Sequence, residues 1–448
     1  MRSMASMKRA LRRAGLLAVA AASLASPMAT PARAQVEIQW WHAMAGPNGE
    51  RIVKIANDFN ASQHEYKIVP TFKGSYADTM NAGIAAFRAG GAPHILQVFE
   101  VGTATMMAAK GAIKPVYQLM QETGEPFDPK SYLAAVTGYY STAKGEMLSF
   151  PFNSSTEVMW VNLDALKKAG IDKIPATWPD TFAAATKLHQ AGYDKCGIST
   201  AWFTWANIEQ FTAWHNIQLS TKANGLDGFD TVLTFNKNPV VVRHFENLAR
   251  YQKDKTFDYS GRTNEGEGRF TSGECPLFIT SSAFLGAVNG AAKFKWTTAF
   301  MPYYPDVKGA PQNSIIGGAS LWVMGGKSKQ EYKGVAKFLT YLSKPEVQAW
   351  WHEQTGYLPI TNAAYELAKK EGYYDKNPAA EVSIKQMTLH PPTENSRGLR
   401  LGNLAQMRDV WMEEIEQVLA GKKTAQAGLD AAAERGNQML RQFQRTVR

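Results

Sequence analysis

Residues 36–100 decide the fold, and they run VEIQWWHAMAGPNGERIVKIANDFNASQHEYKIVPTFKGSYADTMNAGIAAFRAGGAPHILQVFE. Three stretches have the alternation or apolar content of β-strands: residues 36–40, 66–72 and 94–99. Between the first two, apolar side chains recur on one helical face: Ile52, Ile55, Ala56 and Phe59. A second helix is predicted near residues 77–88, and Glu100 follows the third strand. This alternation predicts a parallel sheet covered by helices.

The same alternation returns after residue 150. Further strands are predicted at residues 157–162, 196–199, 276–281 and 321–324. The last ninety or so residues have mostly helical patterns. No repeat and no low-complexity linker divides the chain, so the backbone should cross more than once between two α/β lobes. Such a crossing leaves a cleft between the lobes, which is where ligands bind.

The first 34 residues have the three parts of a secretory signal peptide. A head that carries Lys8, Arg9, Arg12 and Arg13 and no acid precedes the apolar run of residues 16–25, and Ala32-Arg33-Ala34 supplies a cleavage pattern. The apolar run is too short to favour the alternative, a membrane anchor. No cysteine at the predicted cut suggests a lipid anchor, so the mature chain is expected to begin near Gln35 in the periplasm.

The composition of the remaining 414 residues is that of a globular protein with two domains. The whole chain is 45% apolar and 20% charged. Six of its basic charges lie in the leader, so the formal charge of +10 falls to about +4. That mild bias, without a basic run interleaved with aromatic residues, argues against nucleic acid as a partner.

The two cysteines, Cys196 and Cys275, leave two alternatives open after export: a disulfide or a buried reduced pair. The chain has no CxxC motif and no cysteine–histidine cluster, which argues against a structural zinc ion. No motif implies a cofactor, so none is expected.

Motifs of known enzyme classes fail in this sequence. His352-Glu353 opens like a zinc protease helix, but Gly356 stands where the second histidine is required. Residues 266–271 begin like a dinucleotide-binding loop, yet lack its third glycine and its preceding strand. Neither a phosphate-binding P-loop nor a GxSxG nucleophile elbow occurs. We therefore expect a protein that is not an enzyme, although scattered carboxylates leave a hydrolase as an alternative.

Three segments have the polar and aromatic side chains that suit a binding site. Pro151–Thr156 is predicted as a serine-rich turn, and Ile315–Ser320 as a glycine turn that lets backbone approach a ligand. Trp202 and Trp205 provide large flat faces with a polar edge. Each feature has a simpler structural explanation, an ordinary turn or a filled core, when it is taken alone.

Five motifs together resemble the periplasmic sn-glycerol-3-phosphate-binding proteins of ABC importers: FKGSYADTMNAGIAAFRAGGAPHILQVFEVGTATMMA, FPFNSSTEV, APQNSIIGGASLWVM, TGYLPIT and GLRLGNLAQMR. The resemblance runs from about Trp40 to the C-terminus. The wider family, which includes maltose-binding protein, implies a two-lobed periplasmic binding protein fold. Each lobe would be a mostly parallel sheet flanked by helices, joined by hinge strands that close over ligand.

The resemblance also implies the residues that contact the ligand: Tyr76, Glu100, Ser155, Trp202, Trp205, Ser281, Gly318, Tyr357 and Arg408. Ser282 is a near alternative to Ser281, and Arg400 is the rival of Arg408 for the cationic role. Glu100 would take glycerol hydroxyls, the tryptophans would cover the glycerol chain, and the arginine would meet the phosphate. No metal ion belongs to this set.

The implied function is capture of sn-glycerol-3-phosphate, with glycerophosphodiesters as further candidates, and delivery to the membrane permease of an ABC importer. Residues 35–147 and 303–356 are assigned to the N-terminal lobe, and residues 148–302 and 357–448 to the C-terminal lobe. A monomer is expected. The alternatives are an oligosaccharide-binding protein of the same fold and a secreted hydrolase of phosphoesters or glycosides.

Overall fold

The computed structural model describes residues 35–447 apart from residues 110 and 143, so the predicted signal peptide lies outside the described residues. The first five elements follow the order predicted from residues 36–100: β1 (Val36–His42), α1 (Gly46–Ser62), β2 (Tyr66–Phe72), α2 (Tyr76–Arg88) and β3 (Ile95–Phe99). The four apolar residues predicted to share a face of α1 are all buried. Helix α2 begins with a capping box between Ser75 and Asp78.

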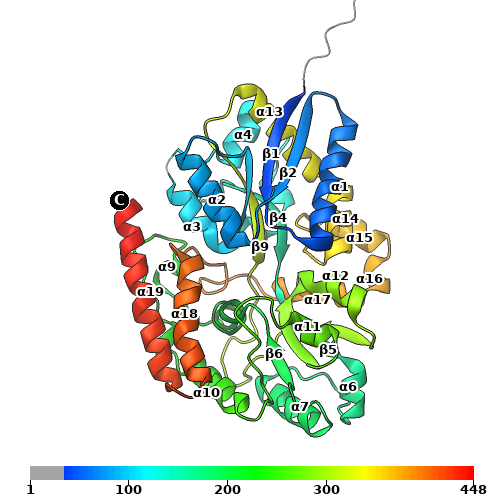
Figure 1. The fold of residues 1–448 in the computed structure, drawn as a ribbon, viewed down its shortest axis with the longest axis vertical. Coiled ribbons are helices and arrows are strands. Elements are labelled where there is room, and N and C mark those ends of the chain that lie inside the picture. Colours follow the sequence, from blue (N-terminus) through cyan, green and yellow to red (C-terminus); the bar gives the residue numbers. More distant parts are fainter. Residues whose placement is uncertain (1–34, 110, 143, 448) are drawn as a thin grey trace, which may run out of the picture. The chain divides into compact units, whose positions relative to one another are not determined.

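The first sheet has five strands in the order β2-β1-β3-β9-β4, with β9 at Gly317–Val323 and β4 at Phe150–Ser155. Strands β2, β1 and β3 pair in parallel, with Val36 opposite Tyr66. Strand β9 is antiparallel to both β3 and β4. The sheet is therefore mixed, because β9 returns from the second sheet in the opposite direction (Figure 1).

Two turn predictions are wrong. Pro151–Thr156 and Ile315–Ser320 contribute to paired strands β4 and β9 instead. Strand β4 lies at the edge of the sheet, where the missing N–H of Pro151 costs little. The pairing is interrupted between Pro151 and Asn153, which is a β-bulge or a similar irregularity.

The second sheet has four strands in the order β6-β7-β5-β8: β6 (Ile198–Thr200), β7 (Leu277–Ser281), β5 (Glu157–Asn162) and β8 (Trp296–Ala299). Only β6 and β7 pair in parallel, whereas β5 is antiparallel to both of its neighbours. The expectation of a mostly parallel sheet is wrong here. Strand β5 follows β4 after one residue, Thr156, and enters the second sheet first. Strands β7 and β8, which come later in the chain, then pair with β5 in the antiparallel direction on either side.

The remaining helices fall into three groups along the chain. Before β4 lie η1 (Glu100–Gly102), α3 (Thr103–Ala108), α4 (Val116–Thr123), η2 (Pro129–Ser131) and α5 (Ala134–Tyr140). Between β5 and β8 lie α6 (Leu163–Lys168), α7 (Trp178–Gln190), η3 (Trp205–Gln210), α8 (Phe211–Trp214), α9 (Thr221–Asn224), η4 (Phe235–Lys237), α10 (Pro239–Gln252), α11 (Glu267–Thr271), η5 (Ser282–Phe284) and α12 (Leu285–Ala291). After β9 lie α13 (Lys329–Leu342), α14 (Pro345–Thr355), α15 (Asn362–Lys370), α16 (Tyr373–Lys376), α17 (Pro378–Met387), α18 (Leu404–Leu419) and α19 (Ala425–Val447). No helix in the described part of the chain combines the length and apolar character needed to cross a membrane.

The backbone passes between the two sheets more than once, as predicted. At the first crossing, the Thr156 hydroxyl donates to the carbonyl of Ile315 at 2.8 Å. Gln210 bonds both backbone groups of Ile315, at 2.7 and 3.0 Å, and so ties the return crossing to η3. Beside them, the Leu358 amide donates to the carbonyl of Ser154 at 2.7 Å. Residues far apart in sequence thus meet where the two sheets adjoin.

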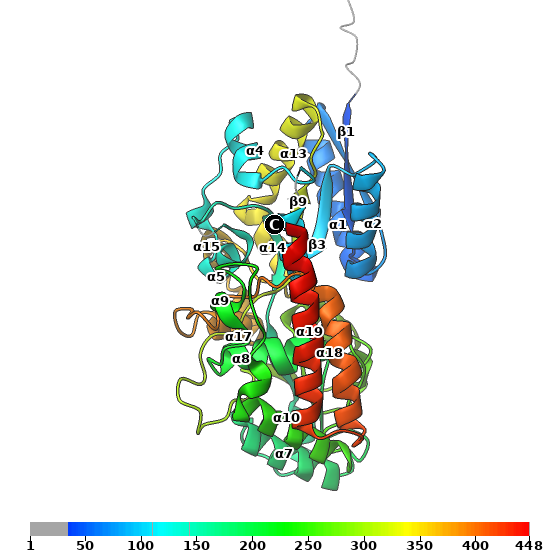
Figure 2. The same ribbon diagram turned by 90° about the vertical axis from the view of Figure 1, so that its left-hand side faces the viewer.

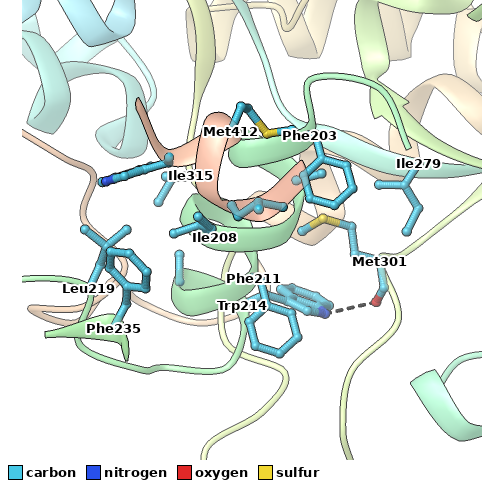
Figure 3. Packing of buried hydrophobic residues seen from close by; sticks show 14 of the residues in the cluster. Phe203, Ile208, Phe211, Trp214, Leu219, Phe235, Ile279, Met301, Ile315 and Met412 are labelled. Carbon is cyan, nitrogen blue, oxygen red and sulfur yellow. Dashed lines mark hydrogen bonds between the residues drawn. The ribbon is translucent and has the colours of Figure 1, made fainter. Parts of the chain in front are cut away.

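Two large apolar clusters support the sheets, and one of them joins side chains of both, such as Leu96 of β3 and Ile279 of β7. The other surrounds Trp40, Ile52 and Phe338 at the first sheet. Figure 3 shows part of the cluster that spans both sheets, with Ile208 of η3 and with Phe211 and Trp214 of α8, and the Trp214 indole donates to the carbonyl of Met301 at 2.9 Å. Near the second sheet, Cys196 and Cys275 form a disulfide, which decides between the two alternatives left by the sequence.

Helices α18 and α19 pack side by side, as both views of the ribbon show (Figures 1 and 2). Helix α18 also contacts α10 of the second-sheet region and η1, which follows strand β3 of the first sheet. Because η1 begins at Glu100 and α18 carries Arg408, this contact brings two of the predicted site residues together.

Candidate ligand-binding cleft

A cavity of about 290 Å³ is lined by residues from both sheet regions. Its lining comprises Ala45, Pro47, Asn48, Arg51, Tyr76, Phe99, Glu100, Ser155, Trp202, Trp205, Asn264, Glu267, Ser281, Ala283, Phe284, Gly286, Ala287, Gly318, Tyr357 and Arg408. All nine residues implied by the resemblance are present in this set. The alternatives Ser282 and Arg400 are absent from it.

The first-sheet wall of the cavity is built on two tyrosines. Tyr76 opens α2 and stacks on Phe99, with ring centroids 5.6 Å apart. Its hydroxyl accepts a hydrogen bond from the Asn153 amide at 2.8 Å and lies 3.4 Å from the hydroxyl of Tyr357. Burial raises the pKa of both tyrosines, so both remain protonated and able to donate to a ligand.

Arg408 lies between two carboxylates. Its Nε and Nη2 atoms donate to the two oxygens of Glu209, each at 2.7 Å, and Nη2 also donates to Glu100 at 2.8 Å. We call Glu100, Glu209 and Arg408 the inner cluster. Among the described residues, no acceptor bonds Nη1 of Arg408, so this group can still donate to a ligand.

Burial and the oppositely charged neighbours act in opposite directions on the pKa of Arg408 and on that of Glu100. Burial lowers the pKa of Arg408, but the two carboxylates more than compensate and raise it overall. Burial raises the pKa of Glu100 in spite of the attraction to Arg408. The guanidinium therefore stays charged, and it faces two carboxylates rather than one.

Backbone and hydroxyl groups line the centre of the cavity. Gly318 has a φ of +89°, and a Cβ atom there would lie 1.9 Å from the carbonyl oxygen of Asn153, so only glycine fits. Ser155 ends strand β4, opposite Gly317. Ser281 ends β7, and its hydroxyl accepts from the Ala283 amide at 3.1 Å.

The two tryptophans come from an unusual segment after β6. Trp202 has a φ of +49°, and its amide donates to the carbonyl of Thr263 at 2.7 Å. Trp205 begins η3, a π-helix, and its ring packs so closely on Gly317 that a Cβ there would lie 2.3 Å from it. Strained backbone and π-helical turns are concentrated at functional sites, which agrees with the placement of both rings at the cavity.

Arg400, the rival of Arg408, has a structural role in this fold. Its Nη2 atom donates to the carbonyls of Tyr139 and Ser141 at 2.9 and 2.7 Å. Burial lowers its pKa. Ser282, the alternative to Ser281, is buried away from the cavity and its hydroxyl has no partner among the described residues. The geometry thus favours Ser281 and Arg408 over their alternatives.

Sequence reasoning missed two charged residues of the lining, Arg51 and Glu267, which we call the outer pair. Arg51 lies in the first turns of α1, and its guanidinium donates to Asn48 at 3.1 Å. Glu267 begins α11 and accepts from the Thr280 hydroxyl at 3.0 Å. Neither forms an ion pair with another described residue. Glu267 lies in the glycine-containing stretch that fails as a dinucleotide loop, and that stretch gave no other signal.

The cavity shows no donor set for a metal ion. Within residues 35–447, apart from the two gaps, no group of three or more His, Cys, Asp and Glu side chains could hold one. The polar lining instead consists of hydroxyls, amides, guanidinium groups and carboxylates, which bind an organic ligand through hydrogen bonds.

Comparison with known proteins identifies the family. A model of the bacterial extracellular solute-binding protein family matches residues 54–382. The sn-glycerol-3-phosphate-binding periplasmic protein UgpB of Escherichia coli is 50% identical over 420 residues, which is 93% of this chain and 95% of that protein. UgpB of Pectobacterium atrosepticum is 49% identical over 98% of this chain and 99% of its own.

Solved structures show the same fold at lower identity. UgpB from Mycobacterium tuberculosis, in complex with glycerophosphocholine, has a TM-score of 0.76 at 18% identity and covers 91% of this chain and 98% of its own. The cyclic α-maltosyl-1,6-maltose-binding protein of Arthrobacter globiformis has a TM-score of 0.73 at 20% identity, covering 91% and 100%. The two-lobed α/β fold and the resemblance inferred from the motifs are confirmed, and the chain belongs to the bacterial extracellular solute-binding protein family.

Proposed function

We propose that this protein captures sn-glycerol-3-phosphate in the periplasm and delivers it to the permease of an ABC importer. One observation carries the proposal: all nine residues implied by the family resemblance line one cavity. Close relatives that cover nearly the whole chain are named for binding this ligand in the periplasm, which supports both ligand and location. Glycerophosphodiesters are further candidate ligands, since a related structure holds one.

In this proposal the phosphate lies beside Arg408. The free Nη1 atom of Arg408 supplies a charge-assisted donor, and the hydroxyls of Ser155 and Ser281 supply neutral ones. Glu100 accepts hydrogen bonds from the glycerol hydroxyls, and Trp202 and Trp205 cover the carbon chain. A guanidinium already paired with two carboxylates binds a phosphate less strongly than a bare one would, which suits reversible capture.

Binding is expected to close the cleft. We assign residues 35–147 and 303–356 to one lobe, and residues 148–302 and 357–448 to the other. Tyr76, Glu100 and Gly318 then belong to the first lobe, Tyr357 stands at the border and is counted with them, and the other five predicted contacts belong to the second lobe. A small ligand that touches both sets favours the closed state through these differential contacts, and the closed form is what the permease would recognise.

Small-angle scattering tests this closure. The radius of gyration should decrease when just-saturating sn-glycerol-3-phosphate is added, and the Arg408→Ala variant should show a smaller decrease at the same concentration. A radius that is the same with and without bound ligand would contradict a closing cleft.

The main alternative is an oligosaccharide-binding protein, because proteins that bind maltose-type sugars share the fold and the cavity has aromatic walls. A hydrolase is the less favoured alternative, and we propose that the protein is a monomeric binder without catalysis or cofactor. Calorimetric titration with sn-glycerol-3-phosphate and with maltose separates the two binders. Recovery of unchanged sn-glycerol-3-phosphate after incubation supports a binder, whereas release of free phosphate would support an enzyme.

A further inference from the structure

A series of hydrogen bonds leads through buried amide side chains to the hydroxyl of Tyr76. It begins at the backbone amide of Ala43, which donates to Oε1 of Gln97 at 2.7 Å. The Gln97 amide donates to Oδ1 of Asn153 at 2.8 Å, and the Asn153 amide donates to the Tyr76 hydroxyl, also at 2.8 Å. We call these four groups the hydrogen-bond series. Gln97 and Asn153 are fully buried and do not line the cavity, whereas Tyr76 does.

The first member fixes the direction of every bond in the series. A backbone N–H can only donate, so the atom of Gln97 that faces Ala43 must be the carbonyl oxygen. The NH2 group of Gln97 then faces Asn153 and requires an oxygen there, which leaves the NH2 group of Asn153 for Tyr76. Turning either amide round would bring two donors or two acceptors together in a buried site, which is costly.

The Tyr76 hydroxyl accepts at the end of the series, so its own proton must point elsewhere. Among the described residues, its one further partner is the Tyr357 hydroxyl at 3.4 Å, well beyond the usual O–H···O separation of about 2.7–2.8 Å. The Tyr76 ring stacks on Phe99 with only 4° between the ring planes, which restricts its movement. The hydroxyl therefore reaches the cavity with a proton that no close acceptor of the described chain takes.

The first sheet holds the two amides in place. Gln97 lies in β3 opposite Leu321 of β9, and Asn153 lies in β4 opposite Ala319 of the same strand. Because β9 lies between β3 and β4, the amides meet across it. The irregular pairing just before Asn153 is of the kind that redirects side chains beside functional sites.

We propose that Gln97 and Asn153 are positioning residues that make the Tyr76 hydroxyl a dedicated hydrogen-bond donor to the ligand. A serine hydroxyl can turn to donate or accept, but a hydroxyl held in this way only donates. It favours an acceptor oxygen of the ligand, such as a phosphate oxygen, and disfavours a group that must itself donate. The inference deepens the proposed function and rests on it, because it concerns how one predicted contact recognises sn-glycerol-3-phosphate.

Asn153→Asp tests the direction of the series. A carboxylate there accepts from both Gln97 and Tyr76, so the Tyr76 proton turns away from the ligand. Titration calorimetry at about pH 9 should show sn-glycerol-3-phosphate bound about ten- to a hundredfold more weakly than by the wild type. At about pH 5 most of the loss should disappear, because a protonated carboxyl group accepts from Gln97 and donates to Tyr76 as the amide does. Comparison with the wild type at each pH removes the titration of the ligand and of the neighbours Glu100 and Tyr357.

Tyr76→Phe separates this effect from repulsion between the new charge and the phosphate. It removes the hydroxyl through which the series acts, so adding Asn153→Asp to it should weaken binding less than about threefold. Gln97→Glu reverses the series one step earlier and should also weaken binding at high pH. Asn313→Asp is the matched control, because Asn313 is equally buried, donates to backbone carbonyls and does not line the cavity. It should lower thermal stability and leave the affinity nearly unchanged.

Two results would overturn the proposal. One is an Asn153→Asp protein that binds as tightly as the wild type from about pH 5 to about pH 9. The other is a loss of the same size with and without the Tyr76 hydroxyl, because that loss is repulsion alone. If the wild-type protein does not bind sn-glycerol-3-phosphate at all, the proposed function itself fails. Thermal unfolding curves show whether each variant is folded, and Gln97→Glu replaces Asn153→Asp in the comparison if the latter is not.

Discussion

The inner cluster and the outer pair line the same cavity but differ in how their charges are compensated. In the inner cluster, Arg408 is held by three hydrogen bonds to Glu100 and Glu209 before any ligand arrives. In the outer pair, Arg51 contacts a neutral amide and Glu267 a neutral hydroxyl. The hydrogen bonds of the inner cluster fix the position of the Arg408 guanidinium, whereas Arg51 and Glu267 have no charged partner among the described residues.

Because of this difference, we expect the inner cluster to contribute mainly to affinity and the outer pair mainly to selectivity. A buried, preorganised guanidinium loses little conformational entropy on binding, so its removal should affect every phosphorylated ligand. An unpaired charge in the lining, such as that of the partly exposed Arg51, affects mainly the rate of association and the choice among ligands. Substitutions in the two regions should therefore differ in the size and kind of their effects.

Arg408→Ala should weaken binding of sn-glycerol-3-phosphate about 30-fold to several thousand-fold. The variant loses the charge-assisted donor and leaves Glu209 buried without its cation, which together cost about 2–5 kcal/mol. Titration calorimetry measures the change. Arg400→Ala is the comparison, because Arg400 donates to backbone carbonyls outside the cavity. It should lower thermal stability and leave the affinity nearly unchanged; the opposite pattern would transfer the phosphate role to Arg400.

Glu209→Gln should reduce the free energy of unfolding of the ligand-free protein by about 3 kcal/mol, because it breaks a buried ion pair whose carboxylate is only 1% exposed. Chemical denaturation measures the loss. Glu413→Gln is the control: it breaks an ion pair with Arg435 in which the carboxylate is 50% exposed, and the expected change is below about 1 kcal/mol. Equal losses in both variants would show that the inner cluster is not specially stabilised.

Glu267 should make stability depend on pH with a definite sign. Its pKa rises from 4.5 when unfolded to about 7 when folded. The folded state thus binds the proton more tightly, and the protein loses stability as pH rises from about 4.5 to about 7. Glu267→Gln removes that loss, so the variant should be more stable than wild type by about 1–2 kcal/mol at pH 8 and by little at pH 4.5. A difference that is the same at both pH values would place Glu267 in an ordinary, solvated environment.

The smallest effect is expected for Arg51→Gln. Because Arg51 is partly exposed and lies in the first turns of α1, its charge should act mainly on the approach of an anionic ligand. Stopped-flow measurements at low salt should show association with sn-glycerol-3-phosphate slowed a few-fold, with the difference vanishing at high salt. A large loss of affinity that persists at high salt would instead make Arg51 a direct phosphate ligand.

The secondary structure was predicted best from the sequence where apolar residues recur at a regular spacing. Strand β2 was predicted at residues 66–72 and is found there, and the face of α1 that carries Ile52, Ile55, Ala56 and Phe59 is buried as expected. Strand β4 was mistaken for a turn, because Pro151 and the serines that follow are typical of turns. Its strand conformation depends on pairing with β9, which lies more than 160 residues later, so no local pattern reveals it.

The candidate site could be predicted through the family motifs but not from local physics. Nothing in the sequence around Glu209 indicates that its carboxylate meets Arg408, because the two residues are 199 positions apart in the chain. Arg51 and Glu267 were missed because no motif marks either residue, and their place in the lining depends on the folded chain. Such tertiary contacts are visible only in the folded chain.

A crystal structure of the complex with sn-glycerol-3-phosphate tests the central claim most directly. The account predicts a phosphate oxygen within hydrogen-bond distance of Nη1 of Arg408, with Ser155 and Ser281 as further donors and the glycerol hydroxyls on Glu100. Glu267 should have no contact with this small ligand. A phosphate bound to Arg51, with Nη1 of Arg408 left without a ligand contact, would contradict it.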